Sequence, residues 1–318
     1  MADQQVLLIE SQCHISMDTG RVLFKKTDGQ TRTELAEDIA VLCLHHEQIT
    51  ISHHALRALS QASCAVITTD AQHMPCGILH PLSQQSTTIA NTRLHEQIRL
   101  EFTPERKAQL WQNLIAQKIQ NSALVLRLLK LNGALRLERL AQQVQPDDAT
   151  NAEGQAAKYY WQQWFAHPNI TPVANKRLKQ NAGDLVNARL NYAYAVLRAM
   201  ISRELIIAGL NPSLGVGHIN RGNPFNLADD LIEPYRCVAE WAVAQTEDFE
   251  AEFIGIEKQY LLRDLMCEVK LTHDADNQYR LPQAISQTVQ SYCRALAEPS
   301  KPIKLKLPKE LHHENQSS

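Results

Sequence analysis

The sequence predicts an α+β fold in which a small N-terminal β-rich domain, residues 1–82, precedes a larger all-α domain, residues 92–298. The first eighty residues contain short β-branched runs separated by turn residues, which are typical of strands. From about residue 92 onward, apolar residues recur every three or four positions, which is the period of a helix. Residues 83–91 are polar and turn-rich, so we expect them to form a linker.

Five strands and one helix are predicted in the N-terminal domain. The strands cover residues 6–10, 21–26, 39–44, 49–52 and 64–69. Ser52 can cap a helix that runs through HHALRALSQA, because its hydroxyl can accept a hydrogen bond from a free amide of the first turn. Strands are therefore expected to dominate this region.

The second domain is predicted to consist of helices, with one short hairpin near its end. Thr103 supplies a capping hydroxyl and Pro104 fits the first helical position, so a helix is expected to begin there. Gly209 is expected to end a long helix, because glycine readily adopts the left-handed conformation found there. Helices are also predicted at 151–165, 184–209, 224–244, 258–267 and 282–297, with a hairpin at 269–281 that turns at 274–277. Residues 299–318 hold prolines and lysines and few residues able to pack, so we expect a disordered tail.

The composition is that of an ordinary globular protein. Hydrophobic residues make up 44% of the chain and charged residues 21%. No apolar run approaches the roughly 20 residues of a membrane span, and the N-terminus lacks the pattern of a signal peptide. The seven cysteines are scattered and form no CxxC pair, which favours free thiols in a reducing compartment. We therefore expect a cytoplasmic protein without a membrane partner.

The charges of the chain are segregated along the sequence. Acidic residues dominate positions 229–264, whereas positions 176–204 carry six basic residues against two acidic ones. The six are Lys176, Arg177, Lys179, Arg189, Arg198 and Arg203. Such segregation allows a polyanion to lie on one face of the molecule. The alternative is that these charges merely solvate helix surfaces.

The most informative segment is residues 211–236, NPSLGVGHINRGNPFNLADDLIEPYR. It places His218 on a glycine-rich loop just before a helix that Asn223 can cap. Asp230 and Glu233 lie three residues apart on that helix, where like charges repel unless a cation lies between them. A histidine with carboxylates suits Mn²⁺, Mg²⁺ or Zn²⁺, and spare positions for water favour Mn²⁺ or Mg²⁺. The alternative is an ordinary loop histidine with solvent-facing acids. Pro234 predicts a kink at the cluster.

Glu153 in NAEGQAAKYYW is the candidate for a third metal ligand from elsewhere in the chain. Small residues beside it would let another backbone or a substrate approach. The alternative is structural, since Thr150 and Glu153 match the spacing of a capping box, in which the glutamate only satisfies an amide. The aromatic residues that follow, Tyr159, Tyr160 and Trp161, could stack on bases or belong to the core.

Both segments closely resemble motifs of the CRISPR-associated Cas-one family, the integrase of spacer acquisition. Its type II branch carries a GLNP-(x)-LG-(x)-H loop followed by NPFNLADDL-(x)-EP-(F/Y)-R, and the family's first catalytic motif is a glutamate in a helix similar to NAEGQAAKYYW. The resemblance implies that Glu153, His218 and Glu233 bind Mg²⁺ or Mn²⁺. It implies that Asp230 is a further catalytic residue, either an outer partner or an alternate ligand.

The resemblance further implies a metal-dependent DNA integrase and endonuclease. Such an enzyme joins the 3′-hydroxyl ends of protospacer DNA into the CRISPR repeat array by transesterification. The implied partners are double-stranded DNA, a second copy of the chain bound through the β-rich domain, and a dimer of the small Cas-two protein in a heterohexamer. His218 could alternatively act as a general acid.

The basic residues 176–203 listed above are candidates for contacts with DNA phosphates. Asn211 and Arg221 flank the site and could position the strand that is cut. Two other functions remain open from the sequence: a metal-dependent structure-specific nuclease in DNA repair, and a non-catalytic dimeric scaffold that binds DNA.

Overall fold

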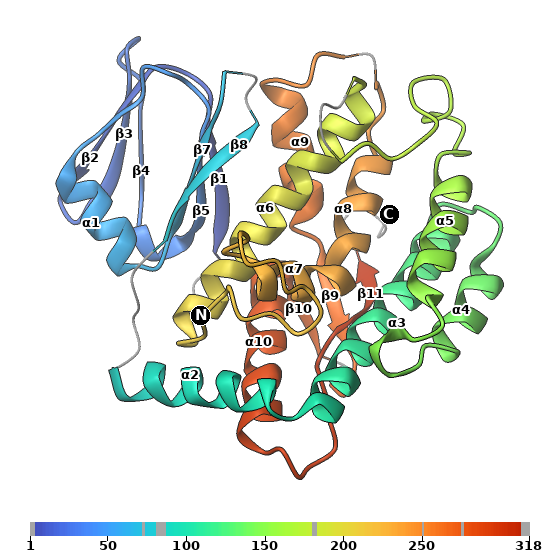
Figure 1. The fold of residues 1–318 in the computed structure, drawn as a ribbon. Helices are drawn as coiled ribbons and strands as arrows, with labels where there is room; N and C mark the ends of the chain where they lie inside the picture. Colours follow the sequence, from blue (N-terminus) through green and yellow to red (C-terminus); the bar gives the residue numbers. More distant parts are fainter. Residues whose placement is uncertain are drawn as a thin grey trace.

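The computed structural model describes residues 4–71, 74–80, 87–179, 183–249, 251–274 and 277–312. Strands fill the N-terminal region, and helices form a larger body beside it (Figure 1). All seven cysteines are free, as predicted. Within the described residues, no helix has both the length and the apolarity to cross a membrane.

Two four-stranded sheets form the N-terminal domain. One has the order β1-β5-β7-β8, with β8 antiparallel to three parallel strands. Its strands are β1 (Gln5–Ile9), β5 (Ile39–Leu44), β7 (Ala65–Thr69) and β8 (Pro75–Leu79). The other has the order β4-β3-β2-β6. Its strands are β4 (Thr31–Glu34), β3 (Arg21–Lys26), β2 (Cys13–Asp18) and β6 (Thr50–Ile51). The sequence prediction missed β2, β4 and β8.

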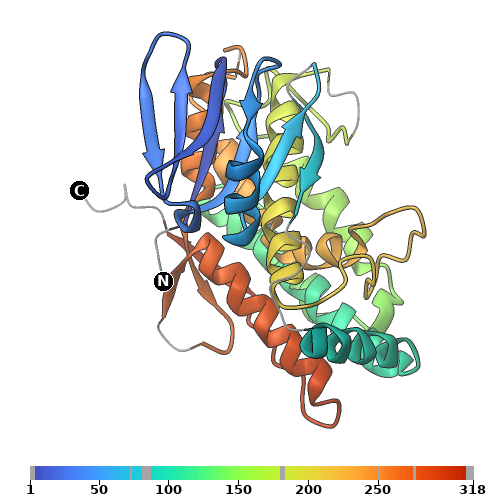
Figure 2. The same cartoon turned by 90° about the vertical axis from the view of Figure 1, so that its left-hand side faces the viewer.

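A small apolar core holds this domain together. Ile15, Val22 and Leu42 are completely buried in it, together with Leu59 of helix α1 (His53–Gln61). The Ser52 hydroxyl accepts a hydrogen bond from the Ala55 amide at 3.2 Å, so the predicted cap is confirmed. Helix α6 packs against β5, β7 and β8, which joins the sheet to the helical body (Figure 2).

Nine helices of four residues or more follow in the described part beyond residue 86. They are α2 (Thr87–Glu101), α3 (Pro104–Leu128), α4 (Ala134–Gln142), α5 (Ala152–Trp164), α6 (Leu185–Ile207), α7 (Asn226–Ile232), α8 (Arg236–Ala244), α9 (Ile256–Leu265) and α10 (Leu281–Ala297). The predicted ends of α6 are confirmed, because Asp184 caps its start and Gly209 follows its end with φ +80°. The predicted linker 83–91 is wrong from Thr87 onward, where α2 begins, and its first part lies outside the described residues.

The second domain is not all-α, because it also holds a three-stranded sheet. Strands β9 (Glu268–Leu271) and β10 (Gln278–Arg280) form the predicted hairpin, although part of its turn, residues 275–276, lies outside the described residues. Strand β11 (Pro308–His312) pairs with the other side of β9. The prediction of a disordered tail is therefore wrong up to residue 312, and residues 313–318 lie outside the described residues.

The tail is ordered because its leucines are buried. Leu305, Leu307 and Leu311 are at most 7% exposed. Ile303, Leu305 and Leu307 occupy alternate positions, which is the period of a strand with one buried face. The prolines and lysines between them hid this signal in the sequence.

Candidate active site

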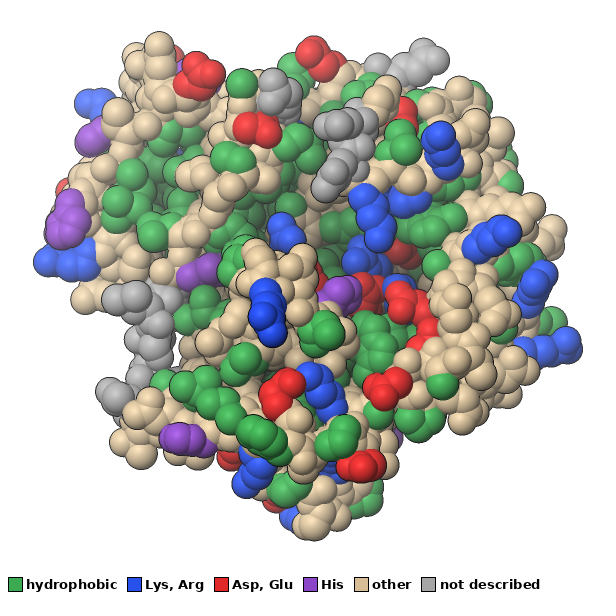
Figure 3. Space-filling model, viewed as in Figure 1, with side chains coloured by type: hydrophobic (Ala, Val, Ile, Leu, Met, Phe, Trp, Pro, Cys, Tyr) green, Lys and Arg blue, Asp and Glu red, His purple; other side chains and the backbone are tan. Residues whose placement is uncertain are grey.

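A cleft lies between α3, α5, α6 and the segment that joins α7 to α8. Its volume is about 590 Å³, and charged side chains of both signs line it. Figure 3 shows acidic, basic and histidine side chains gathered near the middle of this face. Glu153, His218 and Glu233 all line the cleft. The structure therefore brings these residues together from distant parts of the sequence.

Glu153 lies in the first turn of α5, and other residues cap that helix. Its carboxylate is therefore free to face the cleft. Asn151 accepts a hydrogen bond from the Gly154 amide at 3.2 Å. Asp148 accepts one from the amide of Glu153 itself at 3.0 Å. The alternative in which Glu153 forms a capping box with Thr150 is therefore wrong, and its carboxylate binds α3 instead.

Lys118 on α3 joins the two glutamates, and the sequence prediction missed it. Its Nζ lies 2.5 Å from Glu153 Oε1 and 2.6 Å from Glu233 Oε2. Burial lowers the pKa of this ammonium, but the charges of Glu233 and Glu153 and the hydrogen bond to Glu153 together outweigh burial, and the pKa lies above its usual value. No local pattern marks Lys118 in the sequence. Only the packing of α3 against α5 and against the segment around Glu233 shows its position.

Glu233 is the most enclosed carboxylate that faces Lys118. It is 3% exposed, and Arg236 binds both of its oxygens, at 2.7 and 2.9 Å. Burial raises the pKa of Glu233, but the charges of Arg236 and Lys118 outweigh burial and hold the pKa well below its usual value. Glu233 is therefore ionised, and a bidentate guanidinium fixes its orientation.

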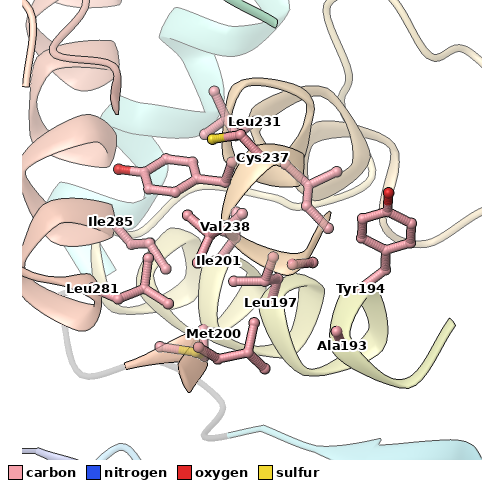
Figure 4. Packing of buried hydrophobic residues seen from close by; sticks show 14 of the residues in the cluster. Ala193, Tyr194, Leu197, Met200, Ile201, Leu231, Cys237, Val238, Leu281 and Ile285 are labelled. Carbon is pink, nitrogen blue, oxygen red and sulfur yellow. The ribbon is translucent and has the colours of Figure 1, made fainter. Parts of the chain in front are cut away.

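A packed apolar layer supports the backbone that carries Glu233 and Arg236. Leu197 and Ile201 of α6 lie beside Val238 of α8 and Ile285 of α10, and all four are at most 1% exposed (Figure 4). Interiors packed this closely resist displacement. The backbone that carries Glu233 and Arg236 is therefore held rigidly in place.

Asp230 organises the loop that carries His218. Its carboxylate is completely buried and accepts hydrogen bonds from the amides of Val216, Gly217 and His218. The same carboxylate accepts one from His218 Nδ1 at 2.8 Å. This last bond raises the pKa of the His218 imidazole, although burial opposes it. Because Nδ1 is engaged, Nε2 is the ring nitrogen that is left for a ligand.

Two glycines let this loop approach its neighbours closely. A Cβ atom at Gly215 would collide with the His218 carbonyl oxygen and with Asp230 Oδ2. A Cβ atom at Gly217 would collide with Trp111, whose ring packs edge-on against the imidazole with centroids 5.7 Å apart. Close approach, rather than a positive φ, explains the glycines at these two positions.

The predicted helix 224–244 is divided in the structure. Helix α7 begins at Asn226, and the Asn223 side chain accepts from the Phe225 amide before the helix instead of capping it. A 3₁₀ turn, Glu233–Tyr235, separates α7 from α8, which confirms the predicted kink at Pro234. The alternative with solvent-facing acids is wrong for Asp230 and Glu233, which are buried.

The three predicted metal ligands, Glu153, His218 and Glu233, do not lie close enough together in this structure to bind one ion. Glu153 and Glu233 already converge on one cation, the Lys118 ammonium, so this pair suits a positive charge. His218 lines the same cleft. Among the residues that the structure describes, no three His, Cys, Asp or Glu side chains lie close enough together to hold an ion. Ligation by all three residues therefore stays a prediction.

The predicted DNA-binding residues fall into two groups. Arg189 and Arg203 are at most 4% exposed and bind protein groups, so their assignment as DNA contacts is wrong. They lie on α6, which other elements cover on several sides, and their charges therefore serve internal contacts. The other six predicted residues are exposed or line the cleft. Lys176, Lys179, Asn211 and Arg221 are exposed, while Arg177 and Arg198 are half-buried in the cleft wall.

The predicted aromatic cluster contributes to the floor of the cleft. Tyr160 is 2% exposed and donates a hydrogen bond to Glu240 at 2.6 Å, so it belongs to the core. Tyr194 donates to the same carboxylate at 2.8 Å, and the Arg236 guanidinium lies 4.7 Å above its ring. Glu240 and Tyr194 were not predicted. Glu240 orients the Tyr194 ring, and that ring packs against the Arg236 guanidinium.

The fold is shared with solved structures of Cas1 proteins and of a casposase. A structure of a casposase bound to integration product matches with a TM-score of 0.76 at 18% identity, over 95% of this chain and 93% of that chain. A CAS1 protein from Thermotoga maritima matches with a TM-score of 0.73 at 13% identity, over 92% and 97%. Structures of a Cas6-RT-Cas1–Cas2 complex and of a TtCas1–DNA complex match with TM-scores of 0.68 and 0.58. The chain therefore has the fold of these Cas1 and casposase structures.

Sequence comparison identifies the family itself. The family model of CRISPR associated protein Cas1 matches residues 6–263. A CRISPR-associated endonuclease Cas1 from Neisseria meningitidis serogroup C (strain 8013) is 34% identical over 269 residues, which cover 83% of this chain and 84% of that protein. The chain belongs to the Cas1 family, the Cas-one family that its motifs resemble.

Proposed function

We propose that this protein joins the 3′-hydroxyl ends of protospacer DNA into a CRISPR repeat by metal-dependent transesterification. The observation that supports it best is the convergence of Glu153 and Glu233 on one cation in a cleft that His218 and basic side chains also line. Mg²⁺ or Mn²⁺ held by these residues would activate the attacking hydroxyl and stabilise charge on the phosphate. The casposase bound to integration product shares the fold, which favours joining over cutting alone.

The chain's own residues can perform the remaining steps. His218 either completes the ligand set through Nε2 or donates a proton to the leaving 3′-oxygen, and Asp230 orients its ring for both roles. Arg177, Lys179 and Arg198 line the same cleft, where they can hold the phosphates of the strand that is attacked. The reaction conserves phosphodiester bonds, since the bond to the incoming 3′-oxygen forms as the bond to the leaving 3′-oxygen breaks.

The proposed partners are double-stranded DNA, a second copy of the chain and a Cas2-type protein. The TtCas1–DNA and Cas6-RT-Cas1–Cas2 complexes share this fold, which supports DNA and Cas2 as partners. We further propose that the β-rich domain forms the homodimer contact and that two homodimers bind one Cas2-type dimer in the cytoplasm. A stand-alone nuclease remains the second candidate, because the Neisseria relative is named an endonuclease.

Free and blocked DNA ends distinguish these two functions. The protein is incubated with Mn²⁺, its Cas2-type partner, a supercoiled repeat plasmid and short DNA duplexes that end in a 3′-hydroxyl or a 3′-deoxy terminus. We expect labelled duplex to become joined to the plasmid only when the 3′-hydroxyl is present, because that group is the nucleophile. Plasmid cutting that is indifferent to the blocked end, without joining, would favour the nuclease.

The exposed Lys179 is proposed to contact a DNA phosphate, so its substitution should change how DNA binding depends on salt. Lys179→Ala is expected to weaken DNA binding and to reduce the slope of log affinity against log salt by about one, because one phosphate contact is lost. Fluorescence anisotropy at several salt concentrations measures this slope. Lys25→Ala, in an exposed position of β3, is the matched control and should leave it unchanged. Equal slopes for Lys179→Ala and the wild type would remove Lys179 from the interface.

Arg189→Met should lower the free energy of unfolding, since the Arg189 guanidinium is buried against protein carbonyls.

A further inference from the structure

The two acidic residues of the cleft share one internal cation. Lys118 Nζ binds Glu153 Oε1 and Glu233 Oε2 at 2.5 and 2.6 Å, and its side chain is 17% exposed. Glu233 has Arg236 as a second partner. Within the contacts of the described residues, the Glu153 carboxylate binds Lys118 alone. The ammonium is therefore the link that holds the two carboxylates in one place.

The charges of this cluster balance while the ammonium is in place. Glu153 and Glu233 supply two negative charges, and Lys118 and Arg236 supply two positive ones. A divalent cation on the same carboxylates would lie beside the ammonium, and like charges repel strongly at such separations in a partly buried site. The two cations therefore exclude each other from this position.

Of the two internal cations, Lys118 is the one that can leave. Arg236 is fixed by two hydrogen bonds to Glu233 and by the ring of Tyr194, 4.7 Å from its guanidinium carbon. Lys118 carries a compact charge on a flexible four-carbon stem, and its side chain lines the open cleft. Rotation of that stem can carry the ammonium into the cleft without movement of α3.

We propose that Lys118 holds the Glu153–Glu233 pair together in the metal-free protein and competes directly with the divalent cation for that pair. The inference rests on the proposed function, because it takes these carboxylates as metal ligands. Lys118 is thus a positioning residue that keeps two like charges from separating before the metal arrives. Its displacement places a mobile positive charge in the cleft where the DNA phosphate is proposed to lie.

Direct Mn²⁺ binding to the full chain, without DNA, tests this competition. Lys118→Met keeps the length of the side chain and removes its charge. We expect it to bind Mn²⁺ roughly tenfold more tightly than the wild type, because charge-assisted hydrogen bonds no longer have to be broken. The electron paramagnetic resonance signal of free Mn²⁺ reports the affinity independently of activity. Lys118→Gln, which keeps a neutral hydrogen-bond donor, provides a second variant if Lys118→Met unfolds.

Lys158→Met is the matched control, because Lys158 is an exposed lysine that lines the same cleft on α5. If Lys158→Met tightens Mn²⁺ binding as much as Lys118→Met, the gain reflects overall charge and the proposal is overturned. If both Lys118 variants bind Mn²⁺ with the wild-type affinity, the proposed competition is overturned, whereas the proposed metal site is retained. Failure of the wild type and of every variant to bind Mn²⁺ would refute the metal-dependent function together with this inference.

Discussion

Glu153→Gln is expected to lower the rate of strand joining roughly a thousandfold, because a metal site contributes several kcal/mol of charge stabilisation and each 1.4 kcal/mol is a factor of ten. The substitution keeps the size of the side chain and removes its charge. The Glu153 side chain is 32% exposed and does not bind Arg236, so the fold should tolerate the change. Glu233 is a less clean target, because its loss would leave the half-buried Arg236 without its carboxylate.

The measurement compares joining of a labelled 3′-hydroxyl duplex with DNA affinity and thermal stability of the same preparation. Glu105→Gln, at an exposed position in the first turn of α3, is the control and should behave as the wild type. Joining at the wild-type rate by Glu153→Gln would contradict the proposed role of this carboxylate. A wild type that binds DNA without joining it, and whose DNA binding Glu153→Gln leaves unchanged, would instead point to the scaffold function.

Removal of residues 301–318 is expected to unfold most of the chain. The deletion removes strand β11 and the buried Leu305, Leu307 and Leu311. Burial of a leucine contributes about 1.5–3 kcal/mol, so the three together contribute roughly 5–9 kcal/mol. Domains are stable by only about 5–15 kcal/mol in total. Far-UV circular dichroism and gel filtration of the truncated chain should show loss of the native state.

A point variant tests the same contact within a folded chain. Leu307→Ala should lower the free energy of unfolding by about 2–5 kcal/mol, as is usual for a truncated core leucine. Urea denaturation measures the change. Leu135→Ala is the control, since Leu135 is 66% exposed and should change stability little. Wild-type stability of both Leu307→Ala and the deletion would show that this segment does not pack as described.

Local signals in the sequence predicted much of the helical part. The cap at Ser52, the start of α6 near residue 184, the glycine after α6 and the kink at Pro234 all occur where they were expected. Each of these features depends on a few neighbouring residues, so the sequence contains the necessary information. Strands β2, β4 and β8 were missed although each pairs antiparallel with a strand nearby in the sequence. They are only four to six residues long, and polar or turn-forming residues interrupt their apolar pattern.

The sequence by itself determined the family, through the motifs around Glu153 and around His218, Asp230 and Glu233, and it predicted the start of α3 and both ends of α6. Only the tertiary structure decided which charges serve the cleft. It placed Lys118 between the glutamates and buried Arg189 in the body of the protein. The physical reason is that capping and helix spacing act over a few residues. Charge pairing and burial instead depend on which distant segments pack together.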